Sequence, residues 1–404
     1  MRVLFLVSHF PRPTIPLAGT WALEQAKALA EVVDLEVACL TPWVPKGLRW
    51  IEKARPWIDV PSVHRWGSVS VGYYKALYYP IAPFRGWAYR APLPQMALAW
   101  ASVEGRLLQT VTRFRPHVLF CHHTAASGYL ASRIHALTGL PYVITDHDFD
   151  EITRCGWFPG RQRFYEGVLR PIFRHICVSS RMEADMRRLF PFVPTETLHN
   201  GVTPPAPERL RVPRPSSLDG KLVVFSAGMF YERKGFPLLV EAFARASARH
   251  PNAVLRIAGD GRERAAMQGV IAKHRLWDRV QLLGRVPHDD VFREMAWSDL
   301  FALVGWDESF GVVYLEAMIS GKPIVACTDA GIADVVQDGV HGVLVPPRDV
   351  EAAASAIDQL LRSPGERLRM GRNAEALVRE RLTWTANVRR LLEIFELSRQ
   401  ARAS

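Results

Sequence analysis

The sequence predicts two α/β domains in tandem, each built on a parallel β-sheet with helices on both faces. Short runs of wholly apolar, β-prone residues alternate with helical patterns, and a proline-rich stretch interrupts this alternation once. Strands that are apolar throughout are typical of parallel sheets that are covered on both faces. A chain of 404 residues is also longer than one ordinary hydrophobic core requires.

The first domain is expected over residues 1–199. Its strands are predicted at 3–7, 35–39, 117–121, 141–145 and 175–179. Between the first two strands, TWALEQAKALAEV has the helical period, with Ala22, Ala26, Leu29 and Val33 on one face. This order of elements predicts a doubly wound sheet.

The second domain is expected over residues 222–382, after a proline-rich linker at 200–221 that shows no periodicity. Its strands are predicted at 222–227, 253–258, 280–283, 300–304 and 323–327. The basic helix at 383–404 is expected to pack back across the linker. Two such domains leave a cleft between the carboxyl ends of their sheets, where ligands of α/β folds bind.

Composition excludes several classes of protein. The five cysteines are widely separated and form no CxxC pair, so neither a zinc knuckle nor a disulfide framework is expected, and a reducing cytoplasm is favoured. The apolar stretch at 1–7 is too short for a signal peptide or a membrane span. We therefore expect a cytoplasmic protein that is soluble or peripheral at the inner face of the membrane.

The formal charge of +11 is concentrated in the N-terminal half, where residues 1–205 hold 23 Lys and Arg against 15 Asp and Glu. Such an excess suits an acidic polymer, anionic lipid headgroups or nucleic acid. No motif in the chain favours nucleic acid.

The segment WDESFGVVYLEAM at 306–318 places two glutamates, Glu308 and Glu316, around the start of a predicted helix. The first stands before the helix and the second about two turns inside it, roughly 12 Å further along the axis. The carboxylates are therefore too far apart to share one proton. They could instead hold hydroxyls at the two ends of an elongated ligand, whose phosphates lie at the helix N-terminus.

This segment, with the GKPIV that follows it, resembles the E-x7-E segment of the family 4 retaining glycosyltransferases, which have two Rossmann-like domains in the GT-B arrangement. Further motifs of the family follow in the expected order along most of the chain. They are HFPRPTIPLAGT, TDHD, HNGV, AGMFYERKGF, GDG and DAGIADVVQDGVHGVLVPPRD.

The resemblance implies a role for each matching residue of the second domain. Glu308 is implied to hold hydroxyls of the donor sugar, and Glu316 the ribose hydroxyls of the nucleotide. Lys234, together with Arg233, is implied to neutralise the leaving diphosphate. Backbone contacts to the donor are implied for Gly228, Val286, Ser309, Phe310, Gly311 and Val312.

In the first domain, the resemblance implies that Gly19 lets the backbone approach the phosphates and that His147 lies near the reacting sugar. The first domain would then bind the acceptor. The implied activity is transfer of a sugar from a UDP- or GDP-linked donor to a glycan or lipid-linked acceptor, in cell-envelope polysaccharide or glycolipid synthesis. No cofactor and no metal is expected.

The sequence departs from the family pattern at two positions. Met229 stands where the family usually has Arg, and Asp334 where it often has Glu. Two alternative functions therefore stay open, a nucleotide-sugar 2-epimerase of the same fold and a non-catalytic nucleotide-sugar-binding subunit.

Two other kinds of site were considered. Asp146, Asp148 and Asp150 alternate like the metal-binding DxD of another glycosyltransferase architecture. Because Lys234, Arg233 and a helix N-terminus already supply positive charge, a required metal is disfavoured. A dinucleotide dehydrogenase is also disfavoured, since no GxGxxG follows the first strand.

Each assignment has a plainer alternative. Two glutamates at this spacing are often surface charge, Lys234 could be a solvated lysine of a turn, GDG could be a tight turn only, and His147 could be structural. The segment from Val60 to Val103 has no acidic residue but many basic and aromatic ones, which suits either an anionic membrane surface or ordinary packing of helices. The residues in question are Arg65, Lys75, Arg85, Arg90, Trp66, Tyr73, Tyr74, Tyr78, Tyr79, Phe84, Trp87, Tyr89 and Trp100.

Overall fold

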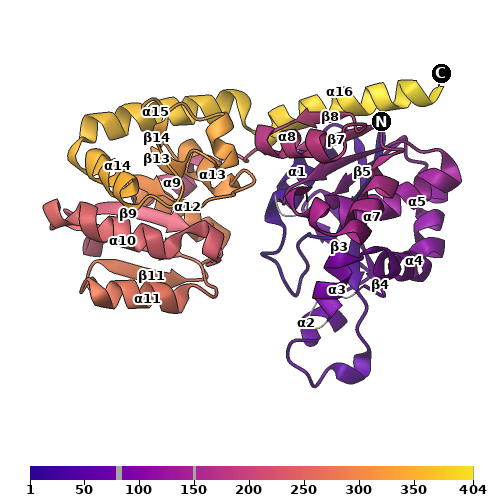
Figure 1. Ribbon diagram of the computed structural model, residues 1–404, viewed down its shortest axis with the longest axis horizontal. Coiled ribbons are helices and arrows are strands. Elements are labelled where there is room, and N and C mark those ends of the chain that lie inside the picture. Colours follow the sequence, from indigo (N-terminus) through magenta and orange to yellow (C-terminus); the bar gives the residue numbers. More distant parts are fainter. Residues whose placement is uncertain (79–83, 149–151, 404) are drawn as a thin grey trace. The chain divides into compact units, whose positions relative to one another are not determined.

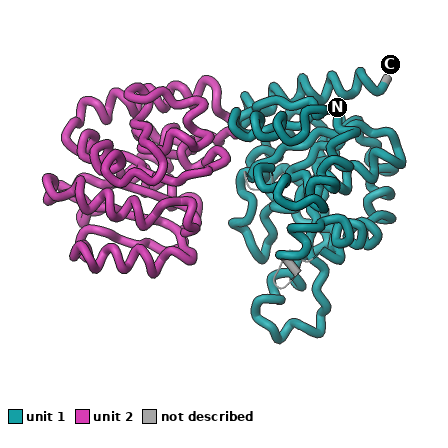
Figure 2. The backbone as a smooth tube through the Cα atoms, in the orientation of Figure 1, with its two compact units in different colours: residues 1–199, 384–404 teal, residues 200–383 magenta. Residues whose placement is uncertain are grey.

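The computed structural model describes residues 1–78, 84–148 and 152–403. These residues form two compact units, residues 1–199 with 384–404 (unit 1) and residues 200–383 (unit 2), shown in Figure 2. Each unit has a central, largely parallel sheet between helices. The predicted fold class, two α/β domains built on parallel sheets, is confirmed.

Unit 1 contains a sheet with the strand order β3-β4-β2-β1-β5-β6-β7-β8. All its neighbouring strands are parallel except β3 and β4, which form an antiparallel pair. The strands are β1 (Arg2–Val7), β2 (Asp34–Pro42), β3 (Val63–Trp66), β4 (Val69–Ala76), β5 (Val118–His122), β6 (Tyr142–Asp146), β7 (Arg174–Cys177) and β8 (Thr195–Thr197).

The helices of unit 1 cover this sheet, and the C-terminal helix is one of them. They are α1 (Thr20–Ala30), α2 (Arg55–Ile58), α3 (Phe84–Arg90), α4 (Leu93–Phe114), α5 (Tyr129–Thr138), α7 (Pro159–Leu169), α8 (Ser180–Leu189) and α16 (Trp384–Ala403). Leu391 and Phe395 of α16 are buried in the same core as Val3 and Phe5 of β1. In Figure 1 this helix, in yellow, runs along unit 1.

Unit 2 contains a parallel sheet with the strand order β11-β10-β9-β12-β13-β14. Its strands are β9 (Leu222–Ala227), β10 (Ala253–Ala258), β11 (Val280–Gly284), β12 (Leu300–Ala302), β13 (Ile324–Cys327) and β14 (Gly342–Val345). Its helices are α9 (Pro207–Leu210), α10 (Phe236–Ala246), α11 (Arg264–Lys273), α12 (His288–Trp297), α13 (Val312–Ile319), α14 (Val350–Arg362) and α15 (Pro364–Arg381).

The proline-rich segment 200–221 makes local contacts with unit 2. Val202 forms a β-bridge with Thr383, and Trp297 Nε1 donates hydrogen bonds to the carbonyl oxygens of Val212 and Pro213 at 3.3 and 3.1 Å. The segment also contains the short helix α9.

The ten predicted strands are all present, with boundaries that shift by up to three residues. Strands β3, β4, β8 and β14 were not predicted. The hairpin β3–β4 lies at the edge of its sheet, where the strands read as mixed polar and aromatic residues rather than as an apolar run. Because β3 and β4 lie at the edge of the sheet, they are not apolar throughout, and a search for apolar runs did not identify them.

The basic and aromatic segment between Val60 and Val103 contributes largely to the fold. Tyr73 is fully buried in β4 and donates a hydrogen bond to the carbonyl of Pro11 at 2.6 Å, and Trp100 of α4 is 5% exposed. Trp87 of α3, by contrast, is 54% exposed. Ordinary packing therefore accounts for the buried aromatic residues, although not for Trp87. Tyr79 and the side chains of Phe84 and Arg85 lie outside the described part of the chain.

Within the described ranges, no helix is both long enough and apolar enough to cross a membrane.

Candidate active site

The segment WDESFG forms a tightly held turn between β12 and α13 in unit 2. The amide of Trp306 donates to the carbonyl of Arg233 at 2.9 Å, and the carbonyl of Glu308 accepts from the amide of Gly331 at 2.9 Å. Gly311 precedes α13 with a φ of 82°, a left-handed conformation that favours glycine. The backbone of the turn is thus held by hydrogen bonds to two neighbouring loops.

Glu308 and Lys234 form a buried ion pair through Glu308 Oε2 and Lys234 Nζ. The two side chains are 8% and 15% exposed. Glu308 is therefore not surface charge, and Lys234 is not a solvated lysine, which excludes the plainer reading of each. The residues are 74 positions apart, so the fold brings together two of the predicted site residues.

The charges around Glu308 favour its ionised form. Burial alone raises the pKa of this carboxyl group, but Lys234 and Arg233 outweigh it, and the net pKa is lowered. The result is a carboxylate that accepts hydrogen bonds at the N-terminal end of α13. A sugar hydroxyl is a suitable donor to such a group.

Arg233 lies in the segment AGMFYERKGF and was implied, together with Lys234, to neutralise the leaving diphosphate. Its Nη1 donates to the carbonyl of Asp307 at 3.3 Å, so the loop and the WDESFG turn support each other. Gly235 ends the loop with a φ of 65°, and a Cβ there would lie 2.5 Å from the carbonyl oxygen of Val304. Only glycine fits this close approach. Earlier in the loop, Met229 is 43% exposed.

Glu316 lies inside α13, and its Oε1 is 2.7 Å from Nε2 of His288. His288 begins α12, two residues after Val286, which lies between β11 and that helix. His288 was missed in the sequence, although its position just after Val286 and Pro287 was a usable signal. One carboxylate oxygen of Glu316 is thus held by His288, while the second is not part of that contact.

The remaining predicted donor residues follow the turn. Ser309 and Phe310 are buried, with exposures of 4% and 1%, and Val312 opens α13. Asp334 ends a short 3₁₀ helix (Gly331–Asp334) that follows the loop bonded to Glu308. The structure therefore brings residues 306–308 of the turn together with Arg233 and Lys234, whereas Glu316 contacts His288.

In unit 1, His147 follows β6 and lies in a cluster of aromatic rings. The centroid of its ring is 4.3 Å from that of His122, 5.7 Å from that of His123 and 6.0 Å from that of Trp21. Gly19, just before α1, has a φ of 69°, and a Cβ there would lie 2.5 Å from the carbonyl oxygen of His9. Glycine is therefore required at position 19 by its backbone conformation and by the nearby carbonyl of His9, independently of any ligand.

His122 anchors this cluster to two helices. Its Nε2 is 2.7 Å from Oε1 of Gln25 on α1, and Gln25 Nε2 donates to Oδ1 of Asn387 on α16 at 2.8 Å. Asn387 in turn donates to the carbonyl of His199 at 2.8 Å. The C-terminal helix thus supports the rings around His147.

Acid should weaken unit 1 through His122. Burial, with His147 and His123 nearby, lowers its pKa well below the ordinary 6.5, so the unfolded chain binds a proton that the folded chain does not. This contribution to stability is full above pH 6.5 and is lost as the pH falls toward the folded pKa, by about 1.4 kcal/mol per pH unit.

Urea unfolding at pH 7.5, 6.5 and 5.5 checks this. The stability difference between wild type and His122→Gln should shrink toward low pH. Val143→Ala, a buried change without a titrating group, should keep a constant difference. A constant difference for both variants would contradict the assignment.

Of the alternating aspartates, Asp146 has its carboxylate oxygens occupied by neighbours within unit 1. Asp146 is fully buried and accepts hydrogen bonds from the amide and hydroxyl of Thr124 at 2.8 and 2.7 Å, while its Oδ2 is 2.9 Å from His175 Nε2. Burial raises the pKa of this carboxyl group, but the hydrogen bond and the charge of His175 lower the pKa by a larger amount. The net pKa is therefore lowered. Asp150 lies outside the described residues.

Comparison with known families gives two matches that together span most of the chain. Residues 18–204 match the family described as Glycosyltransferase Family 4, and residues 210–377 match Glycosyl transferases group 1.

The individual proteins that resemble this chain share a third or less of its residues over the aligned region. The chain is 32% identical to the α-D-kanosaminyltransferase of Streptomyces kanamyceticus over 160 residues, which is 40% of this chain and 42% of that protein. A sucrose-phosphate synthase from Thermosynechococcus elongatus has a similar structure, with a TM-score of 0.77, 20% identity and full coverage of both chains. The Anabaena protein HepE in complex with UDP-glucose aligns with a TM-score of 0.71 and 20% identity over 98% of this chain and 99% of that one. The fold is therefore the GT-B fold.

Proposed function

The chain belongs to the family 4 glycosyltransferases, and from this membership we propose that it is a retaining, metal-independent enzyme that transfers a sugar from a nucleotide sugar to a glycan or lipid-linked acceptor. The observation that carries the proposal is the buried Lys234–Glu308 pair at the N-terminal end of α13. An ionised carboxylate beside an ammonium group and a helix N-terminus can hold sugar hydroxyls and phosphates at adjacent points.

In this proposal unit 2 binds the donor. Glu308 accepts hydrogen bonds from the sugar, and Glu316, oriented by His288, accepts them from the ribose. Lys234 and Arg233 stabilise the charge that develops on the leaving diphosphate, with the backbone amides at the start of α13. Since these groups already supply positive charge, no metal is required. The proposed donor is UDP- or GDP-linked, since a relative that is 29% identical to this chain is a GDP-mannose-dependent mannosyltransferase, whereas HepE was solved with UDP-glucose.

We assign acceptor binding to unit 1, with His147 beside the reacting sugar. The acceptor attacks the face from which the nucleotide leaves, and the leaving phosphate takes the acceptor's proton. No carboxylate is assigned as a nucleophile. We further propose a cytoplasmic protein that meets an anionic membrane surface through the segment 60–103, where Trp87 and Leu93 are exposed by 54% and 52%.

A thermal-shift screen with nucleoside diphosphates and nucleotide sugars tests the donor site. A ligand that binds only the folded protein raises its melting temperature, by an amount equivalent to about 2.7 kcal/mol at 100 times its dissociation constant. We expect one base and one sugar to give a shift, and the same shift in the presence of EDTA.

Three other outcomes, the first from this screen and the other two from a turnover assay with the donor that it identifies, have distinct meanings. A shift that EDTA abolishes would show that a metal is required. Donor consumption without any acceptor, with release of an isomeric nucleotide sugar, would favour the 2-epimerase. Binding without transfer or hydrolysis would favour a non-catalytic subunit, for which exposed Met229 would be the first residue to change to Arg.

A further inference from the structure

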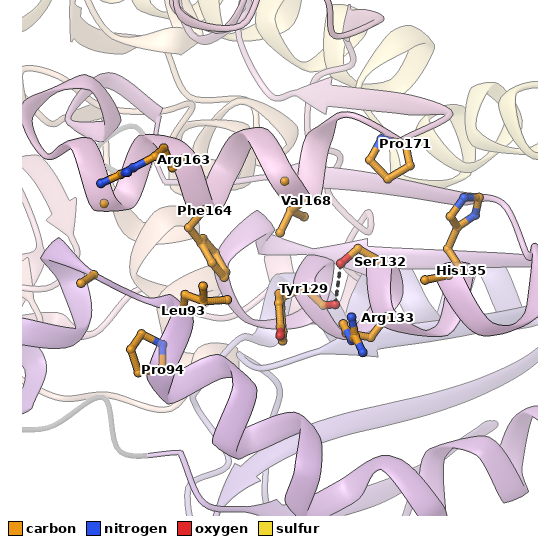
Figure 3. Close-up of a pocket in the computed structure, with 14 residues that line it drawn as sticks. Leu93, Pro94, Tyr129, Ser132, Arg133, His135, Arg163, Phe164, Val168 and Pro171 are labelled. Atoms are coloured by element: carbon orange, nitrogen blue, oxygen red, sulfur yellow. Dashed lines mark hydrogen bonds between the residues drawn. The ribbon is translucent and has the colours of Figure 1, made fainter.

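A pocket of 780 Å³ lies in unit 1 between α5 and α7, beside the start of α4 (Figure 3). This volume is within the range of sites that bind small molecules, about 300 to 1,000 Å³. The pocket uses none of the residues assigned to donor or acceptor binding.

The pocket is open because small residues occupy facing helical positions. On α7 the lining residues recur at intervals of three and four, as do those on α5, so each helix presents one continuous stripe. The small residues among them are Gly160 and Gly167 on α7 and Ser132 and Ala136 on α5, where His135 also lines the pocket. Glycine, serine and alanine leave the space that larger side chains would fill.

The floor of the pocket is apolar. Phe164 and Val168 are 5% and 2% exposed, and the ring of Tyr129 stacks on Phe164 with centroids 5.4 Å apart. Leu93 of α4, which is 52% exposed, completes this wall. A hydrocarbon chain in the pocket would therefore leave water for contact with apolar side chains.

The rim of the pocket is basic. Arg133 and Arg163 line it and are exposed, and no acidic residue is among the lining side chains. Arg133 lies near the ring of Trp100, and Arg163 Nε donates to the carbonyl of Pro159 at 3.4 Å. Within the described ranges, neither arginine forms an ion pair with a carboxylate. Their charge is thus available to an anionic ligand.

We propose that this pocket binds the hydrocarbon chain of an anionic membrane lipid, whose phosphate is attracted by the basic rim that Arg133 and Arg163 form on two sides of the pocket. Arginine is suited to phosphate because its planar group donates two parallel hydrogen bonds. The exposed side chains of Trp87, Leu93 and Leu98 on α3 and α4 add apolar contact of the kind that lies at a membrane interface. The proposal goes beyond sugar transfer, since lipid binding is measured without donor or acceptor.

Calorimetric titration of the full chain with 1-oleoyl lysophosphatidic acid, below its micelle concentration, tests the proposal. We expect one molecule bound per chain. Oleoyl lysophosphatidylcholine, which has the same chain but no net charge, should bind at least 10-fold more weakly. Glycerol 3-phosphate, the headgroup alone, should give no measurable binding.

Gly167→Trp should weaken this binding at least 10-fold by filling the pocket. A Cβ at position 167 has no heavy atom within 4 Å, so the fold accepts the new side chain. Gly105→Trp on α4 is the matched control, because position 105 is equally open and exposed but does not line the pocket. If Gly167→Trp does not fold, Ala136→Leu tests the same space from α5.

The charge is tested separately with Arg133→Gln and Arg163→Gln combined. This variant should lose the preference for the phosphate lipid over the choline lipid, whereas Lys46→Gln with Lys53→Gln, which removes the same charge elsewhere in unit 1, should keep it.

Unchanged lipid binding by Gly167→Trp, equal weakening by Gly105→Trp, or no binding by the wild type would each overturn the proposal.

Discussion

Replacing Glu308 with Gln is expected to lower the kcat/KM of sugar transfer by about 100-fold or more. The carboxylate is buried, and Lys234 and Arg233 keep it ionised. A charged acceptor contributes about 1.5 to 3 kcal/mol per hydrogen bond, and two sugar hydroxyls would use two such bonds. Gln has nearly the same shape but lacks the charge. The measurement is the initial rate of product formation with the donor that the thermal-shift screen identifies.

The same substitution also removes the buried partner of Lys234, so loss of activity must be separated from loss of fold. Breaking a buried pair on one side costs more than replacing both charges. The double variant Lys234→Gln with Glu308→Gln should therefore regain stability relative to Glu308→Gln alone, while sugar transfer stays low.

Glu366→Gln on α15 is the matched control. Its carboxylate is exposed and pairs with Arg369 within one helix, so its loss should change neither rate nor stability appreciably. Transfer by Glu308→Gln at the wild-type rate would contradict the role assigned to Glu308.

The site in unit 2 could be predicted from the sequence to the extent that it is continuous along the chain. The residues of WDESFG are neighbours, and the strand-to-helix turn that exposes them follows from the apolar run before it and the helical period after it. Gly311 and Glu308 were identified in this way, and the structure confirms the turn.

Side-chain pairing across the fold could not be predicted, because it depends on which loops meet at the edge of the sheet. Lys234 follows β9 and Glu308 follows β12. These two strands are neighbours in the sheet, although Lys234 and Glu308 are 74 residues apart in the sequence. Neither the periodicity nor the composition of the sequence predicts that these two strands are adjacent. The contact between His288 and Glu316 was missed for the same reason, since α12 and α13 are separated by β12.

The C-terminal helix α16 was expected to pack back across the linker, but the residues that it contacts were not predicted. Its sequence reads as a basic helix and does not show which residues of the first domain it meets. Val388, Leu391 and Phe395 in fact belong to the core of unit 1, and Asn387 bonds with Gln25 of α1. A chain terminus that returns to the first domain is a property of the tertiary fold, and tertiary contacts commonly override what a segment shows alone.

Replacing Asp146 with Asn is expected to destabilise unit 1 by about 3 to 5 kcal/mol, the usual cost of removing one partner from a buried, hydrogen-bonded charged group. The carboxylate of Asp146 has no exposed surface and lies at hydrogen-bond distance from the amide of Thr124, its hydroxyl and Nε2 of His175. An amide has only one oxygen and must point its NH₂ group at Thr124 or His175. At least one of these contacts is then lost without water to replace it.

Urea unfolding at pH 7 measures the loss of stability, and hydrogen exchange shows which elements of unit 1 are destabilised. Protection should fall in β6 and in the π-helical turn His123–Gly128 that carries Thr124, while β9 to β14 should be unaffected. Asp185→Asn, on the surface of α8 beside Arg188, should change stability by less than about 0.5 kcal/mol.

The pH dependence of Asp146→Asn separates the charge from the packing. Because the pKa of Asp146 is lowered in the folded protein, its contribution is present above the unfolded value of 3.8 and is lost as the pH falls below that value. The gap between wild type and Asp146→Asn should therefore be widest near neutral pH and narrow below pH 4. A gap that stays constant into acid would assign the cost to shape alone. It would leave the aspartate before His147 with no electrostatic role, and the reason for a carboxylate at position 146 would then have to be sought in the reaction.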